Sequence, residues 1–440
     1  MMSQRPQGGK GKGKGKRALW SWALYDWATQ SFSTIILTFV YGAYFTRQVA
    51  LNPEKGATQW AMTVGLTGLC VALCGPFLGA IADNEGRRKP WLATGTVVGA
   101  LASAGLWFVY PRPDDVVLAL SLLAVASFSI HTAAIFYNAM LGDLADRETY
   151  GRWSGRGWAM GYVGGLFCLA SVYILFLREN AWIALDHESA QPIRAAFPFA
   201  SIWLILFSIP IFAVAPDRKP SGYTRGEAAR AGLRQLRESL RNVRRYRFVV
   251  RFLIARALYS DGLATIFAIG GVYAAGTFDM QEANVLLFGV ALSLSAGLGA
   301  AAFSAIDDRI GSRQTILMAL TALLVFSSLI LWVQDVFWFW VCGILMGFFV
   351  GPAQASSRAY LSQLVPEPLR AQMFGVYALA GRSTSFLGPI IVGALTALFQ
   401  SQRIGLGIVP LYFAVGLWIL RGVPRDAHQR LRGEDPHAFD

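Results

Sequence analysis

Residues 20–45 read WSWALYDWATQSFSTIILTFVYGAYF, a stretch of 26 residues in which apolar and small polar side chains dominate. An α-helix of this length crosses a bilayer with some tilt. Its one charged residue, Asp26, lies nine residues past Arg17 and would sit about 13 Å inside that basic edge by helical rise. A carboxylate at that depth is costly unless it faces water, a partner or a substrate. We therefore expect Asp26 to face a cavity, the alternative being a helix end in the headgroups.

The composition indicates a polytopic membrane protein. The 440 residues are 55% hydrophobic and only 15% charged, and the mean hydropathy is +0.44, whereas soluble domains carry about 25% charged residues. The net charge of +13 is spread over loops. A nucleic-acid binder would concentrate that charge on one soluble face, so we expect a lipid bilayer and no nucleic acid as a partner.

The sequence carries no pattern typical of a metal centre or an enzyme. All four cysteines lie in apolar runs, and Cys70 and Cys74 share a helical face without a histidine or carboxylate beside them. Two thiols alone make a poor metal site, and no disulfide framework is implied. No nucleophile with a base, no nucleotide-binding loop and no metal cluster appears. We expect neither enzymatic activity nor a cofactor.

Eleven more apolar runs follow the first, which predicts an all-α protein with twelve transmembrane helices. They fall near residues 59–82, 90–110, 116–141, 154–177, 196–215, 249–275, 284–306, 314–334, 336–361, 372–399 and 404–421. The boundary between the two runs on either side of Asp335 is the weakest, because only Gln334 and Asp335 separate them.

The distribution of lysine and arginine predicts the orientation. With the N-terminus inside, 28 of the 39 Lys and Arg residues fall on inner segments, six on outer loops and five within spans. Loops rich in these residues stay preferentially in the cytoplasm. We therefore expect both termini to be cytoplasmic, with residues 1–17 forming a basic, disordered tail near anionic lipid.

One long inner connection, residues 216–248, divides the chain into six spans and six. Leu233, Leu236, Leu240 and Val243 recur there at helical spacing among many arginines. This pattern is typical of a basic amphipathic helix on the inner leaflet, and a calmodulin-target helix is the alternative. The predicted domains are thus two six-helix bundles, residues 18–215 and 249–421, followed by a C-terminal tail at 422–440.

The two halves resemble each other locally, which indicates a duplicated six-helix unit. Ala-Leu-Tyr-Asp at 23–26 is matched by Ala-Leu-Tyr-Ser-Asp at 257–261, and Gly-Ala-Ile-Ala-Asp at 79–83 is matched by Ser-Ala-Ile-Asp-Asp at 304–308. Leu141, Leu144 and Gly155 are likewise matched 220 residues later. Two repeats around a central site are the architecture of many secondary transporters.

Residues 79–89, GAIADNEGRRK, resemble the loop signature of the major facilitator superfamily between its second and third helices. A glycine allows close helix approach and a glycine at the turn permits positive φ, while the carboxylate can pair with arginines. The resemblance implies a conformational gate built from Gly79, Asp83, Gly86, Arg87 and Arg88. The equivalent residues of the second half are Asp308, Gly311 and Arg313. We expect Arg87, Arg88 and Lys89 to face the cytoplasm. Asn84 departs from the signature, which has a basic residue there.

Over nearly the whole chain the sequence is similar to one branch of that superfamily, the vacuolar amino-acid effluxer-like proteins of fungi and their bacterial relatives. The motifs that carry this resemblance are YDWA at 25–28, FYNA at 136–139, GRGWAMGY at 155–162, GPAQ at 351–354, SR at 357–358, FGVYAL at 374–379, GR at 381–382 and GP at 388–389. The resemblance implies a proton-linked or facilitative carrier. We also expect a monomer in a bacterial inner (plasma) membrane. The drug-antiporter branch fits less well, because its arginine and Gly-Pro motifs are absent from 116–141 and 154–177.

In this fold the first, fourth, seventh and tenth helices line the cavity. The resulting candidates for binding a polar solute or a proton are Tyr25, Asp26, His131, Tyr137, Asn138, Arg256, Tyr259, Asp261, Gln354, Arg358 and Arg382. Asp26 and Asp261 are expected at similar depth. Structural alternatives remain open: a satisfied core histidine at 131, an Arg256–Asp261 ion pair, and inter-helix pairing for Arg358 and Arg382.

The expected function is secondary transport of a small polar organic solute, such as an amino acid or a related metabolite, with proton coupling through Asp26 or Asp261. Two alternatives are a carrier of a lipid, peptide or drug-like compound, and a non-transporting membrane sensor on a carrier fold.

Overall fold

The computed structural model describes residues 12–178, 180–183, 185–186, 188–241, 246–280, 282–381 and 387–424. These residues form helices and connections, without a strand among them. Ten of the helices are long and apolar enough to cross a membrane. The first segment and the pair at 370–399 supply the other two expected spans, so the architecture is consistent with twelve. The prediction of an all-α membrane protein is confirmed.

The first half consists of the following helices: α1 (Lys12–Ser31), η1 (Phe32–Phe39), α2 (Tyr41–Tyr44), η2 (Phe45–Val49), α3 (Pro53–Glu85), α4 (Lys89–Gly105), η3 (Leu106–Phe108), η4 (Pro113–Asp115), α5 (Val116–Leu144), η5 (Arg147–Thr149), α6 (Tyr150–Val172), η6 (Tyr173–Leu177) and α7 (Gln191–Val214). The connection to the second half contains α8 (Arg225–Arg241).

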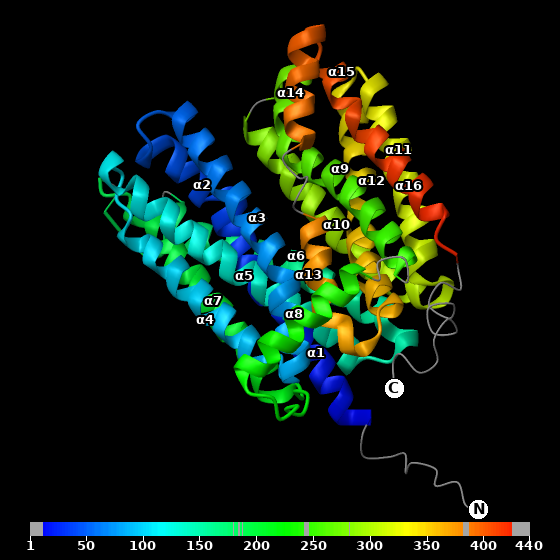
Figure 1. Ribbon diagram of the computed structural model, residues 1–440. Coiled ribbons are helices and arrows are strands. Elements are labelled where there is room, and N and C mark those ends of the chain that lie inside the picture. Colours follow the sequence, from blue (N-terminus) through cyan, green and yellow to red (C-terminus); the bar gives the residue numbers. More distant parts are fainter. Residues whose placement is uncertain are drawn as a thin grey trace, which may run out of the picture.

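The second half comprises α9 (Arg247–Phe278), α10 (Glu282–Ile310), α11 (Ser312–Trp332), α12 (Val336–Leu364), η7 (Glu367–Leu369), α13 (Arg370–Ala380), α14 (Leu387–Phe399), α15 (Gln402–Leu406) and α16 (Ile408–Arg421). Figure 1 shows α2 to α7 gathered in one group and α9 to α16 in another.

Local chemistry explains the main helix boundaries. The uncertain boundary near Asp335 is a real one: the Asp335 carboxylate caps α12 by accepting a hydrogen bond from the amide of Phe337 at 2.8 Å. Gly86 ends α3 with φ of 82°, and Gly311 separates α10 from α11 with φ of 89°, a conformation that favours glycine. The first helix begins earlier than the sequence predicts and passes into the π-helical turns of η1 after Ser31.

Apolar side chains cover the outside of both groups. Leu73, Ile202 and Trp418 are among the many large apolar residues that are more than half exposed. So much exposed apolar surface on a folded chain indicates a lipid environment, and it agrees with the ten membrane-span helices.

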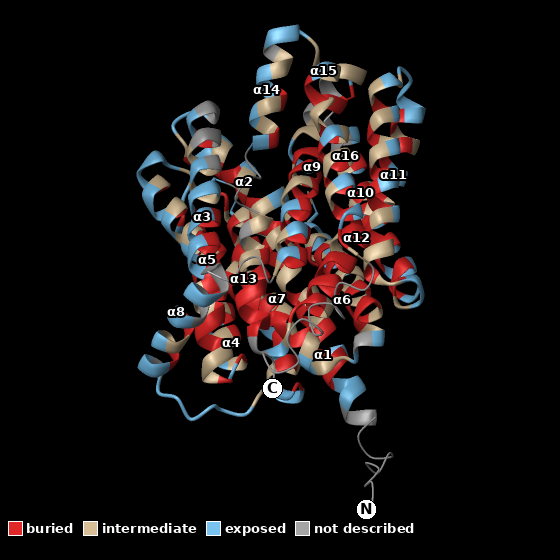
Figure 2. Cartoon of the chain, turned by 45° about the vertical axis from the view of Figure 1, so that its right-hand side comes forward, coloured by how far each residue is buried: buried red, intermediate tan, exposed pale blue. Residues whose placement is uncertain are grey.

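The two halves meet closely at one end of the molecule. This end, where α1 begins, α16 ends and α8 lies, is called the basic face here (Figure 1); the opposite end is the outer end. α3 packs on α13 and α6 packs on α10. Gly75 and Gly375 oppose each other so closely that a Cβ on Gly75 would lie 3.4 Å from the Cα of Gly375. Figure 2 shows the buried residues concentrated in the middle and lower part of the molecule, with exposure rising towards the outer end.

Helix α8 lies on the basic end of α3. A Cβ added to Gly232 would come 3.0 Å from the backbone of Ala80, and Ala228 is fully buried. Leu233, by contrast, is 58% exposed. A helix therefore lies within the predicted amphipathic segment, with α3 covering one side of it. Its contact with the inner leaflet stays a prediction, and Val243 lies outside the described residues.

The orientation can be tested by cysteine labelling. In a background without native cysteines, Glu188→Cys should react with an impermeant reagent only from outside the cell, and Ser221→Cys only after permeabilisation, because the charge distribution predicts that the basic face is cytoplasmic. The reverse pattern would overturn the assigned orientation.

Candidate functional site

A cavity of about 480 Å³ lies between the two halves. Most of the residues proposed from the sequence line it, and they come from helices of both groups: Tyr25 and Asp26 of α1, His131, Tyr137 and Asn138 of α5, Arg256 of α9, and Gln354 and Arg358 of α12. The four helices that the resemblance implied thus meet here, together with α13. The volume is in the range of small-molecule sites.

Arg358 joins the two halves within this cavity. Its Nη1 donates to Oδ2 of Asp26 at 2.9 Å and to Oδ1 of Asn138 at 3.3 Å. Its Nε donates to the Ser154 hydroxyl at 2.8 Å, and its Nη2 donates to the Ser154 carbonyl at 2.7 Å. All of these partners belong to the first half, whereas Arg358 belongs to the second. Only 4% of its side chain is exposed, so the hydrogen bonds compensate a buried charge.

Aromatic rings surround this ion pair. The Arg358 guanidinium lies 4.7 Å from the ring centroid of Trp22, 5.6 Å from Tyr137 and 5.9 Å from Trp158. The Trp22 indole donates to the Tyr137 carbonyl at 2.9 Å, which holds α1 against α5. Cation–π contacts of this kind favour a desolvated guanidinium. The Tyr25 hydroxyl is engaged with Thr96 at 2.7 Å and is therefore held away from the ligand space.

Arg256 occupies the other side of the cavity and has different surroundings. Its Nη1 donates to the Ser260 hydroxyl, and its guanidinium lies 3.9 Å from the ring centroid of Tyr377. Only 8% of Arg256 is exposed. Gln354 lines the same cavity, and its side-chain oxygen is buried without a hydrogen-bond partner among the described residues.

Asp261, a candidate site residue, does not line the cavity with Asp26. Asp261 is 2% exposed and lies beside Tyr412 of α16 rather than among the residues that line the cavity. Counting from the shared tyrosine explains the difference: Asp26 follows Tyr25 directly, but Ser260 follows Tyr259 and Asp261 comes one residue later. One residue turns a side chain by about 100° around a helix.

The remaining candidates have distinct positions. His131 lines the cavity, with its ring 6.1 Å from that of Phe32 in an edge-on arrangement. Tyr259 is fully buried, and its hydroxyl pairs with Ser357 at 2.6 Å. Arg382 lies outside the described residues. Three partners were not singled out from the sequence as site residues, namely Ser154, Trp158 and Tyr377, because their role depends on packing between distant segments.

The gating loop joins the two halves at the basic face. Asp83 accepts a hydrogen bond from Arg88 at 2.8 Å through one oxygen and from the backbone amide of Gln372 at 3.0 Å through the other. Because Gln372 belongs to α13, the carboxylate links both halves. Gly79 allows this approach, since a Cβ there would lie 2.7 Å from the Gln372 nitrogen.

The expectation that Arg88 faces the cytoplasm is wrong. Arg88 is fully buried, and it donates to Asp83, Asp143 and the Ala139 carbonyl. Three acceptors compensate its charge, which explains why it folds inward. Arg87 is exposed, as expected. Asp143 also accepts from Arg370 of the second half at 3.0 Å, which adds another link between the halves.

The connection between the halves reaches the same network. Arg218 donates to Glu367 of η7 and lies 3.6 Å from Asp143. The hydrogen bond from Arg218 lowers the pKa of Glu367. The connection is therefore attached to both halves beside the gate.

The corresponding loop of the second half makes an equivalent contact between the halves. Asp308 of α10 forms an ion pair with the Arg152 guanidinium, with Nε 2.9 Å from Oδ2, and accepts a hydrogen bond from the Arg152 backbone amide at 2.8 Å. Arg152 belongs to α6, so this pair also joins the two halves. Arg313 instead donates to the carbonyls of Val423 and Arg421 at the end of α16. The internal repeat thus supplies two equivalent contacts at the basic face.

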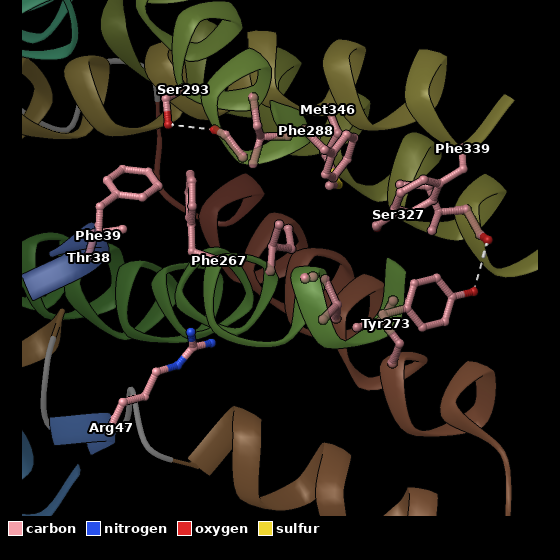
Figure 3. Close-up of a pocket in the computed structure, with 18 residues that line it drawn as sticks. Thr38, Phe39, Arg47, Phe267, Tyr273, Phe288, Ser293, Ser327, Phe339 and Met346 are labelled. Atoms are coloured by element: carbon pink, nitrogen blue, oxygen red, sulfur yellow. Dashed lines mark hydrogen bonds between the residues drawn. The ribbon is translucent and has the colours of Figure 1, made fainter. Parts of the chain in front are cut away.

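A second cavity has a volume of about 500 Å³, and Figure 3 shows the residues that line it. Its lining includes Arg47, Phe288 and Phe339, which lie near the helix ends opposite the basic face, so the cavity is nearer the outer end. Its walls are mostly apolar side chains of the second half, such as Phe267, Phe288 and Phe339, and Thr38, Phe39 and Arg47 of the first half also line it. The halves therefore enclose open space towards the outer end, whereas they are in contact at the basic face. The described residues contain no group of three or more histidine, cysteine or acidic side chains suited to a metal ion.

Neutralising the gate carboxylate should slow conformational exchange. In Asp83→Asn the links to Arg88 and Gln372 weaken, so turnover should fall at least tenfold while solute affinity changes less than threefold, because a charge-assisted hydrogen bond contributes about 1.5–3 kcal/mol. Transport rates and equilibrium binding on the purified variant measure this. The exposed Asp114→Asn, at the outer end, is the matched control. Unchanged turnover at normal expression would remove the gating role.

The ion pair between the halves can be tested by a double-mutant cycle. Asp26→Asn or Arg358→Gln alone leaves one buried charge unpaired and should lower the thermal midpoint strongly. The double variant should recover part of that loss, with a coupling of about 0.5–3 kcal/mol. Strictly additive effects would show that the two side chains do not act as a pair.

Comparison with known proteins agrees with this geometry. Residues 55–430 match the family described as vacuole effluxer Atg22 like. An MFS-type transporter of Bacillus subtilis, YxiO, is 24% identical over 412 residues, which cover 92% of this chain and 94% of the relative. Autophagy-related protein 22 of Kluyveromyces lactis is 25% identical and covers 78% of this chain and 74% of its own.

Solved structures show the same fold at low sequence identity. The human organic anion transporter MFSD10 superimposes with a TM-score of 0.69 at 14% identity and covers 95% of this chain and all of its own. FucP in its outward conformation gives 0.69 at 13% identity, over 93% of this chain and 99% of its own. Both are major facilitator superfamily folds. Together with the family match over most of the sequence, they show that the chain is an integral membrane protein of the Atg22-like family of major facilitator superfamily transporters.

Proposed function

We propose that the protein is a secondary active transporter that moves a small polar organic solute, such as an amino acid or a related metabolite, by alternating access. The observation that carries this proposal is the polar cavity shared by the two halves, in which Arg358 of one half is held by Asp26 of the other. A site at the interface of two repeats can be opened to either side when the repeats rock against each other.

The contacts at the basic face support such a motion. The links of Asp83 and Asp308 across the halves are few and polar, and they lie at the end opposite the open outer cavity. Breaking these links and closing the outer end would turn the central cavity towards the basic face. The match to a family described as a vacuole effluxer supports a carrier.

We further propose that transport is coupled to protons through Asp26 or Asp261. Intramembrane carboxylates are costly and commonly mark proton paths. Asp26 is the better placed of the two, since it lines the cavity and its partner Arg358 sits across the moving interface. The proposed setting is a monomer in a bacterial plasma membrane. We propose that both termini are cytoplasmic, in agreement with the distribution of lysine and arginine.

Uptake into proteoliposomes tests the function directly. The purified protein should accumulate at least one solute from a panel of small polar metabolites, and an imposed pH gradient should increase that accumulation. Empty liposomes and liposomes with heat-inactivated protein are the controls. A well-folded preparation that transports nothing from a broad panel of metabolites, lipids and peptides would contradict the carrier assignment.

The coupling group can be separated from the binding site by two assays. If Asp26 or Asp261 carries the driving proton, its Asn variant should lose uphill accumulation but keep solute exchange at equilibrium, because exchange requires no net proton release. Concentration of the solute by both variants under a pH gradient would exclude both carboxylates, and His131 would then be the next residue to test. If an Asn variant also loses exchange, its carboxylate is required for solute binding or for the structure.

A further inference from the structure

The two arginines that line the central cavity differ in how their charges are compensated. Arg358 donates to Asp26, Asn138 and Ser154 and is fully engaged by the protein. Arg256 lines the same cavity with 8% of its surface exposed. Its neighbours are neutral: the Ser260 hydroxyl accepts from it, and the hydroxyls of Tyr259 and Tyr377 are within hydrogen-bonding reach. Its Nε has no partner among the described residues.

No carboxylate of the described residues pairs with Arg256, although the sequence left an Arg256–Asp261 pair open. Asp26 is the acidic side chain that lines the cavity, and Arg358 occupies its Oδ2. The charges of Asp26 and Arg358 cancel, so among the residues that the structure describes the cavity keeps one guanidinium without a counter-charge. A buried cation without a counter-charge is costly in a membrane interior, and a ligand that supplies the opposite charge would recover that cost.

We propose that Arg256 is the receptor for an oxyanion of the transported solute, so that the carrier prefers small organic acids to their neutral analogues. This inference rests on the proposed transport function and names the substrate class of the same site. The planar guanidinium matches a carboxylate or a phosphate ester, and both groups share the chemistry that Arg256 recognises.

The other walls indicate where the rest of such a solute lies. Gln354 presents a buried side-chain oxygen without a hydrogen-bond partner, which suits a hydroxyl or amine donor on the solute. Trp158 and Phe374 supply apolar contact on the same cavity. About 480 Å³ is enough for a metabolite of modest size. The acid therefore binds with its charged end at Arg256 and its polar body towards Gln354.

Ligand binding to the purified wild-type protein tests the preference without any substitution. Thermal stabilisation is measured with acid and amide pairs, lactate with lactamide and benzoate with benzamide, and with glycerol 3-phosphate against glycerol, at constant chloride. At least one acid should bind about 10-fold to 100-fold more tightly than its neutral partner, the range expected for a charge-assisted hydrogen bond. Preference for carboxylates or for the phosphate ester identifies which oxyanion is bound. Equal binding of charged and neutral partners, or no binding of any acid, would overturn the proposal.

Substitution then assigns the preference to Arg256. Arg256→Gln should abolish the difference in affinity between acid and amide. Arg256→Lys should retain part of that difference, because the positive charge remains while the paired N–H donors of the guanidinium are lost. Arg156→Gln is the matched control: its guanidinium packs over Trp20 and Trp153 outside the residues that line the cavity, and it should leave the preference intact. If Arg256→Gln does not fold, the lysine variant and the wild-type comparison decide the question.

The outcomes distinguish this proposal from the transport function on which it rests. Wild-type liposomes that take up neutral solutes, with Arg256→Gln equally active, would leave a carrier and refute the oxyanion site. Acid binding that depends on Arg256 without any transport would support the site and contradict the carrier assignment. Retention of the acid preference in Arg256→Gln would overturn the assignment of this residue.

Discussion

A guanidinium held across two halves of the molecule is the interaction on which the structure depends most. Arg358 is contributed by the second half, but its partners Asp26, Asn138 and Ser154 all belong to the first. Burial of an ion pair costs desolvation free energy that only good geometry and further hydrogen bonds offset. Here the further bonds exist only while the halves are docked in this arrangement. The ion pair therefore forms only when the halves have this relative position. Any rearrangement of the halves must supply new partners for both charges.

The internal duplication explains why the basic face closes as it does. Asp83 and Asp308 occupy equivalent places in the two repeats, and each reaches across to the other half, to Gln372 and to Arg152 respectively. When the halves move, such contacts break and others replace them, because a packed interface has two stable arrangements and does not deform continuously. Glycines such as Gly79 and Gly375 bring the backbones close enough for those polar contacts to form. A larger side chain at either position would separate the halves before the carboxylates could reach.

Much of the fold was predictable from the sequence, because hydropathy and charge act locally. The depth of Asp26 within an apolar run predicted a cavity-facing carboxylate, and the structure places Asp26 on the cavity wall. The turn glycine at Gly86 was likewise readable from the motif, and its φ of 82° agrees. The burial of Arg88 was not readable, since its acceptor Asp143 is distant in the sequence. The place of Asp261 off the cavity wall depends on one extra residue, Ser260, between it and Tyr259, which turns the side chain by about 100° around the helix.

Reciprocal opening of the two ends is the central claim, and distance measurements between spin labels test it most directly. One pair, Arg87→Cys with Arg309→Cys, spans the basic face, and another, Asp114→Cys with Trp332→Cys, spans the outer end, each pair joining the two halves. In lipid nanodiscs, with and without a transported solute, the account predicts two populations in which the basic-face distance increases as the outer distance decreases. A single unchanging distance for both pairs, in a preparation that transports solute, would contradict it.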